Sequence, residues 1–239
     1  MTSWLVVGML GSDGAAAAPP DFDVAFTGCT EFAGIGFVPA ANAAPLVPAG
    51  YTLAGDGIDA IVVVRVADCA GVSIDGKKPK AGTVAQIGVT IVGPDATADI
   101  DNYTLWYVTD SGALHGKLTA AGLDNDVDPH LSYTVDPATD SLTADADPPH
   151  APDFALDADV VPPTSPAVPF VARWWAETCH GTLEMRTELP QIAFGGATST
   201  VVTSAGSPLA ALIGDTSLTF AILDSYNTFA TADMTVTVQ

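Results

Sequence analysis

Residues 170–194 carry most of the side chains in this sequence that could perform acid–base chemistry. They include two of the three arginines and three of the four glutamates, and the remaining acidic residues are, with one exception, aspartates. Within this segment, Glu177 and Glu184 lie on either side of His180-Gly181. When two carboxylates face each other, the pKa of one rises and the pair can donate and accept protons. Glu177 and Glu184 are therefore the candidate catalytic residues of a lyase or isomerase.

The alternation of side chains predicts that this segment is a β-hairpin. Residues 170–178 and 182–189 form its strands, and the turn lies at His180-Gly181, where glycine supplies the positive φ that tight turns need. With an even number of turn residues, one face is apolar and the other is polar. The apolar face comprises Phe170, Ala172, Trp174, Ala176, Leu183, Met185 and Leu189. The polar face comprises Arg173, Trp175, Glu177, Thr182, Glu184, Arg186 and Glu188.

The polar face of this hairpin has two interpretations. A two-residue turn would place Glu177 opposite Glu184 and Arg173 opposite Glu188, whereas a four-residue loop would separate the two carboxylates. If the face is exposed to solvent, its ion pairs contribute little stability. If it lines a cavity, its arginines can orient a carboxylate or carbonyl group, and the indole of Trp175 is removed from water. Both interpretations remain open.

The rest of the sequence has mainly β-strand patterns. Residues 60–66 contain five β-branched side chains in an apolar run, which predicts a strand buried on both faces. Arg65 lies inside this run, where it needs a partner and serves either as a structural ion pair or as a cation in a pocket. Asp75-Gly76 predicts a hairpin turn that leads into an alternating strand at residues 83–92, which includes Gln86. An aromatic strand follows at residues 100–108 and includes Tyr103.

Further elements complete a mainly β chain with one or two short helices. Helices are expected after the caps Ser111 and Ser207, and each ends at a glycine. Residues 25–50 are expected to be coil with one short strand. Further strands are expected at residues 131–135, 153–160, 198–203, 218–223 and 234–238. The strand at residues 153–160 is expected to lie at the edge of its sheet. This pattern favours a β-barrel, with a β-sandwich as the alternative.

The chain divides into a short N-terminal segment and a single β-rich domain. Residues 1–24 contain an apolar run and small residues, which predict a truncated signal sequence or a mobile tail, and they favour export to a secreted or periplasmic location. Residues 25–239 form the domain, with a connection rich in proline and aspartate at about residues 136–169.

The charge excludes several classes of partner. The net charge is −21, with seven basic and 28 acidic residues. Nucleic-acid binding needs clustered basic side chains, and the chain has only the cluster Lys77, Lys78 and Lys80. Anionic membrane surfaces are disfavoured for the same reason. We therefore expect a small-molecule partner rather than nucleic acid or membrane, and the oligomeric state stays open.

Three cysteines allow three disulfide pairings. A bond between Cys29 and Cys69 would close a loop worth about 4 kcal/mol in the chain-entropy model and would leave Cys179 unpaired. Spacing alone does not choose among the three pairings.

Motifs for metals and cofactors are missing. The histidines show no metal-ligand spacing, and there is no nucleophile elbow or phosphate-binding glycine loop. The acidic run from Asp124 to Asp128 lacks the glycine and the final acid of an EF-hand, so it is a solvated loop or a looser calcium site. We expect no cofactor and no metal, and a secreted structural or calcium-binding module is a further alternative.

Two phrases resemble acetoacetate decarboxylase-like proteins. They are Pro-Leu-Val-Pro-Ala-Gly-Tyr-Thr-Leu at residues 45–53 and Gly-Thr-Val-Ala-Gln-Ile-Gly-Val at residues 82–89, on either side of an apolar strand. The resemblance covers about residues 45–91 and implies a β-barrel with a small-molecule cavity. The carboxylate of the family falls on Gln86, and its Schiff-base lysine has no counterpart, since the only downstream lysine is Lys117. The resemblance therefore implies that Schiff-base decarboxylation is lost.

These observations together predict an exported, acidic protein that binds a small, partly apolar molecule with a carboxylate or carbonyl group inside a barrel. The candidate ligand-binding residues are Arg65, Gln86, Tyr103, Arg173, Trp175 and Arg186.

Overall fold

The computed structural model describes residues 21–239. The signal sequence or tail expected at residues 1–24 lies outside the described residues except for its last four, and residues 22–24 already belong to the first strand. Within residues 21–239, no helix combines the length and apolar character needed to cross a membrane.

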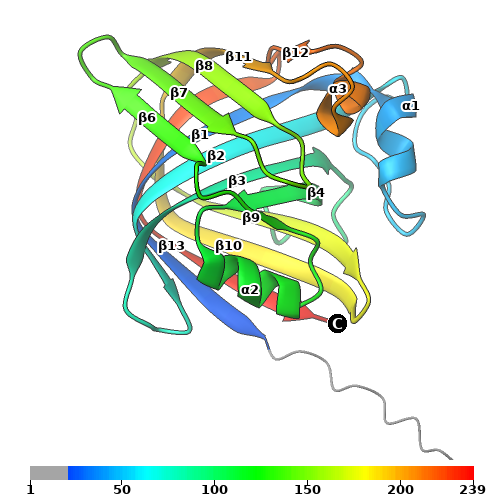
Figure 1. Ribbon diagram of the computed structural model, residues 1–239, viewed down its shortest axis with the longest axis horizontal. Helices are drawn as coiled ribbons and strands as arrows, with labels where there is room; N and C mark the ends of the chain where they lie inside the picture. The colour runs from blue at the N-terminus through cyan, green and yellow to red at the C-terminus, as the bar shows by residue number, and fades with distance from the viewer. Residues whose placement is uncertain (1–20) are drawn as a thin grey trace, which may run out of the picture.

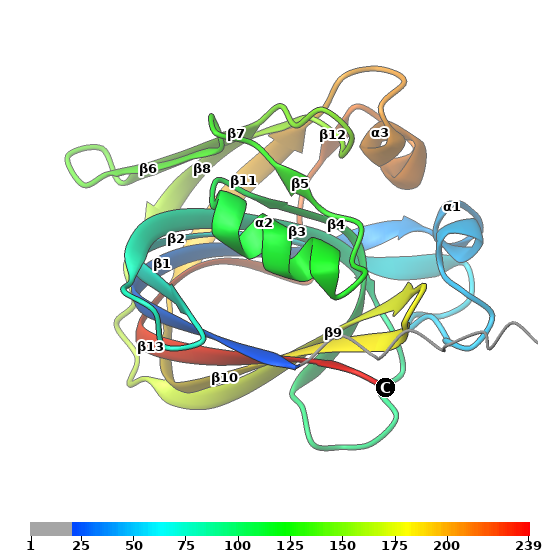
Figure 2. The same ribbon diagram turned by 60° about the horizontal axis from the view of Figure 1, so that its bottom comes forward.

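Seven strands close into a barrel, which confirms the predicted barrel-like β architecture (Figures 1 and 2). They run in the order β3, β2, β1, β13, β10, β9 and β4, and β4 pairs again with β3. Only β4 and β9 run parallel within the barrel, while the other neighbours are antiparallel. The strands are β1 (Phe22–Pro39), β2 (Asp59–Ile74), β3 (Lys80–Thr90), β4 (Ile100–Thr109), β9 (Val168–Thr178), β10 (Gly181–Phe194) and β13 (Leu223–Val238).

A second sheet packs against the outside of the barrel (Figure 1). Its order is β12 (Ser217–Leu218), β11 (Gly196–Val202), β8 (Phe154–Val161), β7 (Ser141–Ala146) and β6 (Ser132–Asp136). Leu142 and Leu156 of this sheet are buried in one cluster with Phe32, Val62 and Val64 of the barrel. The predicted alternation of residues 153–160 is confirmed, but the edge position is wrong, because β8 lies between β7 and β11. Alternation shows only that one face of a strand is covered. In a sheet that has one solvated face, central strands alternate in the same way as edge strands.

Short helices close the ends of the fold. α2 (Gly112–Ala120) begins after Ser111, whose hydroxyl accepts a hydrogen bond from the Leu114 N–H, and its leucines Leu114 and Leu118 pack into the barrel interior. α3 (Pro208–Ile213) begins after Ser207 and ends at Gly214 in the left-handed conformation, as the sequence predicts. α1 (Ala40–Ala43) and the 3-10 turn η1 (Ala44–Leu46) follow β1, and β5 (Asp126–Val127) lies beside β4.

The expectation of coil at residues 25–50 is wrong, because β1 is an 18-residue strand. The alternation of buried residues in β1 is interrupted at Gly28, which has a φ of +61°. The buried residues on either side of it, Phe26 and Cys29, are three positions apart instead of two. Its glycines have a packing role, since a Cβ at Gly34 would lie 2.6 Å from the ring of Phe220. The same packing explains why residues 218–223 are not a continuous strand, because the chain leaves β12 to bury Phe220 against β1.

The β9–β10 hairpin confirms the predicted faces and corrects the predicted pairing. Thr178 pairs with Gly181, so that Glu177 faces Thr182 and not Glu184. The turn residues are Cys179 and His180, one position earlier than predicted. Gly181 has a φ of +130°, which confirms the positive φ expected of this glycine, and a Cβ there would also lie 2.2 Å from the carbonyl oxygen of Gln239. The sequence marks the glycine but not which neighbour requires it.

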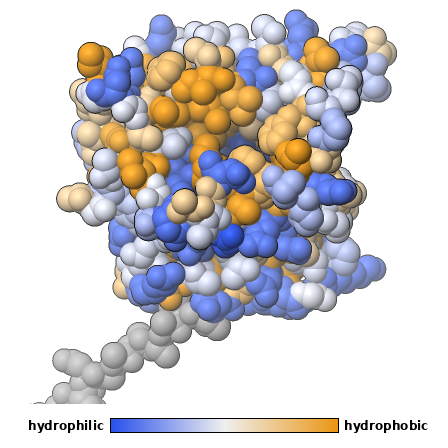
Figure 3. Space-filling model, turned by 180° about the vertical axis from the view of Figure 1, so that it is seen from behind, coloured by the Kyte–Doolittle hydropathy of each residue, from blue (hydrophilic) through white to orange (hydrophobic). Residues whose placement is uncertain are grey.

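The surface combines strong negative charge with apolar areas. Figure 3 shows one face on which apolar side chains gather beside a hollow. Eight large apolar side chains are exposed among the described residues, and they are Phe37, Leu46, Ile58, Val92, Val161, Val168, Val202 and Ile222.

Candidate functional site

The residues singled out from the sequence lie on two sides of the barrel wall. Arg65 and Gln86 point into the barrel, where Arg65 lines an internal cavity. The other candidates do not line that cavity and lie on the outer face or in the groove beside it. These are Tyr103, Arg173, Trp175, Glu177, Glu184 and Arg186. The predicted site therefore separates into an internal and an external one.

The internal site contains a chain of polar side chains that crosses five neighbouring strands. Arg65 donates from Nε to Oε2 of Glu31 at 2.8 Å, and its Nη2 donates to the same oxygen. Asn227 Nδ2 donates to Oε1 of Glu31 at 3.4 Å. On the other side, Arg65 Nη1 lies 3.5 Å from Gln86 Oε1, and Gln86 Nε2 lies 3.4 Å from Thr104 Oγ1. Only the contact between Arg65 and Glu31 is short, so the rest of the chain is loosely hydrogen-bonded.

Among these linked polar side chains, one buried oxygen has no hydrogen-bond partner. Asn227 is 1% exposed, and its Oδ1 accepts no hydrogen bond from any residue in the range 21–239. A buried polar atom without a hydrogen bond costs about 1–3 kcal/mol, so such atoms normally contact water or a ligand. Asn227 therefore marks the point at which an occupant of the cavity would be hydrogen-bonded.

The cavity beside Asn227 is mostly apolar. Its volume is about 70 Å³, which is enough for several water molecules. Its polar residues are Glu31, Arg65, Asn102, Thr187 and Asn227. Its apolar residues are Ala33, Ile35, Val63, Ile100, Phe170, Ala172, Trp174, Leu189, Ile192, Phe194 and Leu223. Apolar walls with a few converging polar groups are typical of small-molecule sites.

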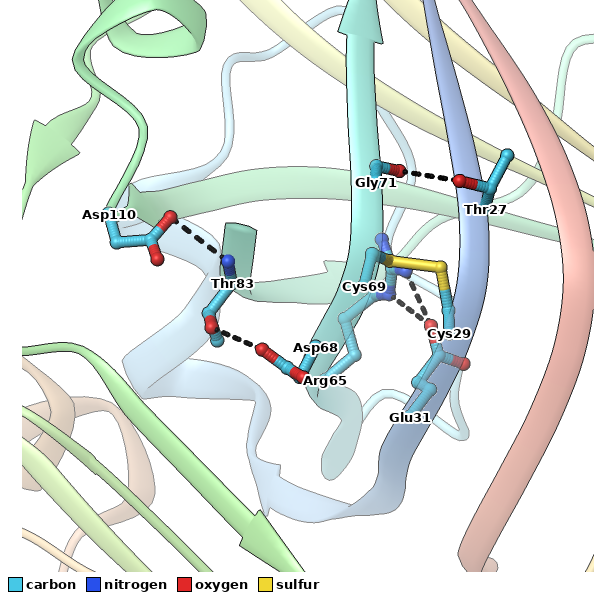
Figure 4. Close-up of a disulfide and its surroundings, with 9 residues drawn as sticks. All are labelled: Thr27, Cys29, Glu31, Arg65, Asp68, Cys69, Gly71, Thr83 and Asp110. Carbon is cyan, nitrogen blue, oxygen red and sulfur yellow. Dashed lines mark hydrogen bonds and ion pairs between the residues drawn. A yellow bond between two sulfur atoms is a disulfide. The ribbon is translucent and has the colours of Figure 1, made fainter. Parts of the chain in front are cut away.

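A disulfide lies directly beside the Arg65–Glu31 pair (Figure 4). Cys29 on β1 is bonded to Cys69 on the neighbouring strand β2, and the two residues are 3% and 1% exposed. Cys179 is free and exposed. Of the three pairings that the sequence allows, the structure selects Cys29 with Cys69, and this bond ties β1 to β2 next to the cavity.

The external site is built around a buried arginine. Arg173 is 3% exposed and donates from Nε to Asp101 Oδ1 at 2.7 Å, and its Nη1 lies 3.0 Å from Asp95. Trp175 Nε1 donates to the same Asp101 oxygen at 3.0 Å. Arg173 and Trp175 are therefore held by Asp101, and their polar atoms already have partners. Arg186, in contrast, forms an ion pair with Glu188 near the surface.

Glu177 and Glu184 lie in a groove of about 660 Å³ over this arginine. The Glu177 carboxylate accepts hydrogen bonds from Tyr51 Oη at 2.9 Å and from Thr182 Oγ1 at 3.1 Å. Burial and the neighbouring Glu177 carboxylate raise the pKa of Tyr51. Tyr103 Oη accepts a hydrogen bond from the Glu177 N–H. The polar face is thus neither part of the barrel cavity nor a plain solvated surface.

Glu184 offers a test of this groove by pH. Burial raises the pKa of its carboxyl group above 4.5, although Arg173 and Arg186 oppose the shift. Because the folded pKa is the higher one, Glu184 favours the folded state most at low pH, and this contribution is lost as the pH rises through the folded pKa. We expect Glu184→Gln to raise the melting temperature at pH 7 relative to wild type and to have little effect near pH 4.

The matched control is Glu188→Gln, because Glu188 lies on the same hairpin face and pairs with Arg186 in an exposed position. It should not raise the melting temperature at pH 7, since surface pairs contribute little. The melting temperatures of both variants are measured between pH 4 and pH 7. If the two variants showed the same change relative to wild type, the burial of Glu184 would be contradicted.

The acidic run at residues 124–128 is not a solvated loop. Asp126 and Asp128 are 5% and 3% exposed. Asp126 accepts hydrogen bonds from the N–H groups of His150 and Ala151, and Asp128 accepts from those of His130 and Asp147. Over residues 21–239, no group of three or more histidine, cysteine or acidic side chains is placed to hold a metal ion. These two aspartates therefore organise backbone turns.

Solved structures with the same architecture share little sequence with this chain. An acetoacetate decarboxylase-like enzyme from Sphingomonas wittichii RW1 aligns over 91% of both chains with a TM-score of 0.59 and 10% identity. Acetoacetate decarboxylase from Legionella pneumophila aligns over 100% of this chain and 96% of its own, with a TM-score of 0.55 and 12% identity. The chain has the acetoacetate decarboxylase-like fold. No protein-family model matches it, and no curated protein does either.

A third structure with this fold contains a small molecule. The enduracididine biosynthesis enzyme MppR complexed with pyruvate aligns over 94% of this chain and 91% of its own, with a TM-score of 0.56 and 10% identity. These identities establish the shared fold alone. They agree with the resemblance at residues 45–91, whose apolar strand is β2 and whose second phrase lies in β3.

The acetoacetate decarboxylase-like barrel of this chain has no lysine at its cavity. All four lysines lie within the described residues, and none lines the cavity. Lys117 forms an ion pair with Asp75 at 2.7 Å, with its ammonium group 5.5 Å from the ring of Phe22. The cation in the cavity is Arg65, and a guanidinium stays protonated and does not act as an amine nucleophile.

The sequence did not point to Glu31, Asn102, Thr104 or Asn227, which complete the internal site. Glu31 carried one usable signal, because it is the only glutamate outside residues 170–194. The sequence predicts coil around Glu31, so this signal alone does not place Glu31 on a strand that faces the barrel interior. The other three are uncharged polar residues in strands, and nothing in their types or spacing separates them from surface positions.

Proposed function

We propose that the barrel interior binds a small, partly apolar molecule with a carbonyl or carboxylate oxygen. The observation that carries this proposal is the apolar cavity beside the Arg65–Glu31 pair, where the buried Oδ1 of Asn227 is an unpartnered acceptor that a donor on the ligand, or a water molecule bound with it, would satisfy. Arg65 Nη1, which makes only a 3.5 Å contact, is free to donate to the ligand oxygen. The pyruvate complex of MppR, which has the same fold, supports a small-molecule role.

We further propose that the ligand is bound without forming a Schiff base. That chemistry needs a desolvated amine, and the four lysines lie away from the cavity. Sodium borohydride with pyruvate should therefore leave every lysine unmodified in the mass spectrum. A reduced lysine adduct would contradict this part of the proposal.

An extracytoplasmic location, secreted or periplasmic, belongs to the same proposal. The Cys29–Cys69 disulfide supports it, because structural disulfides persist in oxidising compartments. The apolar run and small residues near the N-terminus of the sequence also favour export.

The experiment that tests the function compares ligand binding by wild type and by Asn227→Leu. Leucine has a similar volume and removes both polar atoms of the amide. In ligand-observed NMR with pyruvate, butanone and butanamide, we expect at least one probe to bind wild type and to lose tenfold or more affinity in the variant. Glu184→Gln in the external groove is the control and should bind as wild type does. Failure of all three probes to bind, or binding that depends on Glu184 instead of Asn227, would exclude the barrel interior as the site.

A second candidate function is proton transfer by Glu184 in the external groove. The observation that favours it is the raised pKa of this half-buried carboxyl group. Glu177 is the weaker partner in this function, because its carboxylate is already held by Tyr51 and Thr182.

A further inference from the structure

The charges of the ionisable side chains that line the cavity cancel each other. Among the residues that line it, only Glu31 and Arg65 can carry charge, and they form an ion pair with 9% and 17% of their side chains exposed. The other polar lining groups, Asn102, Thr187 and Asn227, are neutral. An anion that enters this space therefore gains no net opposite charge, and burying it without one is unfavourable.

The geometry of Arg65 also disfavours a carboxylate. A carboxylate is recognised best by two parallel N–H donors of one guanidinium. In Arg65, Nε and Nη2 both donate to Glu31, and only Nη1 remains, 3.5 Å from Gln86. A ligand carboxylate on Nη1 would share the guanidinium with the carboxylate of Glu31, so one positive charge would have to offset two negative ones. One remaining donor is suited to a single neutral oxygen.

Asn227 adds a requirement for a hydrogen-bond donor on the ligand. Its Nδ2 donates to Glu31, and a carboxylate can only accept, so the orientation of the amide is fixed with Oδ1 turned away from Glu31. This Oδ1 is the buried atom without a partner. A hydroxyl or N–H group satisfies it, whereas a carboxylate has no proton to donate and would repel it.

The apolar wall defines the rest of the ligand. Trp174 and Ile192 are buried, and Phe170 and Phe194 are partly buried and stack edge to face with 5.8 Å between ring centres. A short hydrocarbon group that contacts these side chains is removed from water at about 25 cal/mol per Å².

We propose, on the basis of the function proposed above, that the cavity selects a neutral molecule over a carboxylate. The preferred ligand is a primary amide or hydroxyl compound with a short apolar group, and its N–H or hydroxyl group donates to Asn227 Oδ1.

The test compares butanamide with butanoate, its isosteric carboxylate, and with butanone, a smaller ketone that has no donor. Wild-type protein is titrated at pH 7 with butanamide, butanoate and butanone, by ligand-observed NMR or calorimetry. Butanamide is expected to bind at least tenfold more tightly than butanoate, and butanone, which has no donor, to lie between them. Butanoate binding as tightly as butanamide, or more tightly, would overturn this inference while leaving a ligand site in the barrel. If none of the three binds, both this inference and the proposed function fail.

A second variant reverses the predicted preference. Glu31→Gln removes the carboxylate that occupies Nε and Nη2 of Arg65, so the variant should bind butanoate at least tenfold more tightly than wild type does. Circular dichroism first establishes that the variant is folded. Unchanged butanoate affinity in a folded variant would contradict the role given to Glu31. The wild-type comparison decides the inference even if this variant does not fold.

Discussion

Replacing Arg65 with methionine is expected to lower the free energy of unfolding by about 3–5 kcal/mol. Methionine fills much of the volume of the aliphatic part of arginine, so little packing is lost. The cost arises because the carboxylate of Glu31, 9% exposed, loses both donors that Arg65 supplies. Only the weak 3.4 Å contact from Asn227 remains. Equilibrium unfolding in urea at pH 7 measures the difference directly.

Two further variants separate the buried charge from other causes. Arg65→Met combined with Glu31→Gln removes both charges and should recover most of the loss, because a neutral pair in the same place leaves no uncompensated ion. Arg186→Met removes the arginine of a pair whose glutamate side chain is 60% exposed, and should cost less than about 1 kcal/mol. Equal effects of Arg65→Met and Arg186→Met would show that the Arg65–Glu31 pair is not buried in solution.

The parts of the fold that could be predicted from sequence are those with local causes. The run of β-branched residues at 60–66 lies within β2, buried between the second sheet and the barrel interior. Asp75 and Gly76 have φ angles of 51° and 68°, which is the tight hairpin turn that this pair of residues favours. The two faces of the β9–β10 hairpin follow from alternation alone. Each of these features depends on neighbours within a few positions.

The site could be predicted only in part, because its contacts are distant in the sequence. Glu31 and Asn227 are 196 residues apart in the sequence, and they meet only because β1 pairs with β13. Alternation also cannot tell which face of a barrel strand points inward. The interior of a small barrel is filled by side chains as a core is, so the apolar face of the hairpin is internal. Arg173 and Glu184 therefore lie outside, where loops partly cover them.

Removing the disulfide with Cys29→Ala and Cys69→Ala is expected to lower the free energy of unfolding by about 4 kcal/mol. The bond joins residues 40 apart, and for a loop of that length the chain-entropy model gives a value of this size. Most of the effect acts on the unfolded chain, which becomes less restricted without the bond. The dependence of stability on urea should therefore also steepen, because the uncrosslinked chain exposes more surface when it unfolds.

The control for the disulfide is Cys179→Ala, since Cys179 is exposed and unpaired. Its urea midpoint should match that of wild type. Because Cys29 and Cys69 are 3% and 1% exposed, a reductant should reach the bond only when the barrel opens, so reduction should be slow in buffer and fast in urea. If mild reductant removed the bond at once without urea, or if the double variant were as stable as wild type, the bond would not hold β1 to β2. The Arg65–Glu31 pair beside it would then depend on the strand ladder alone.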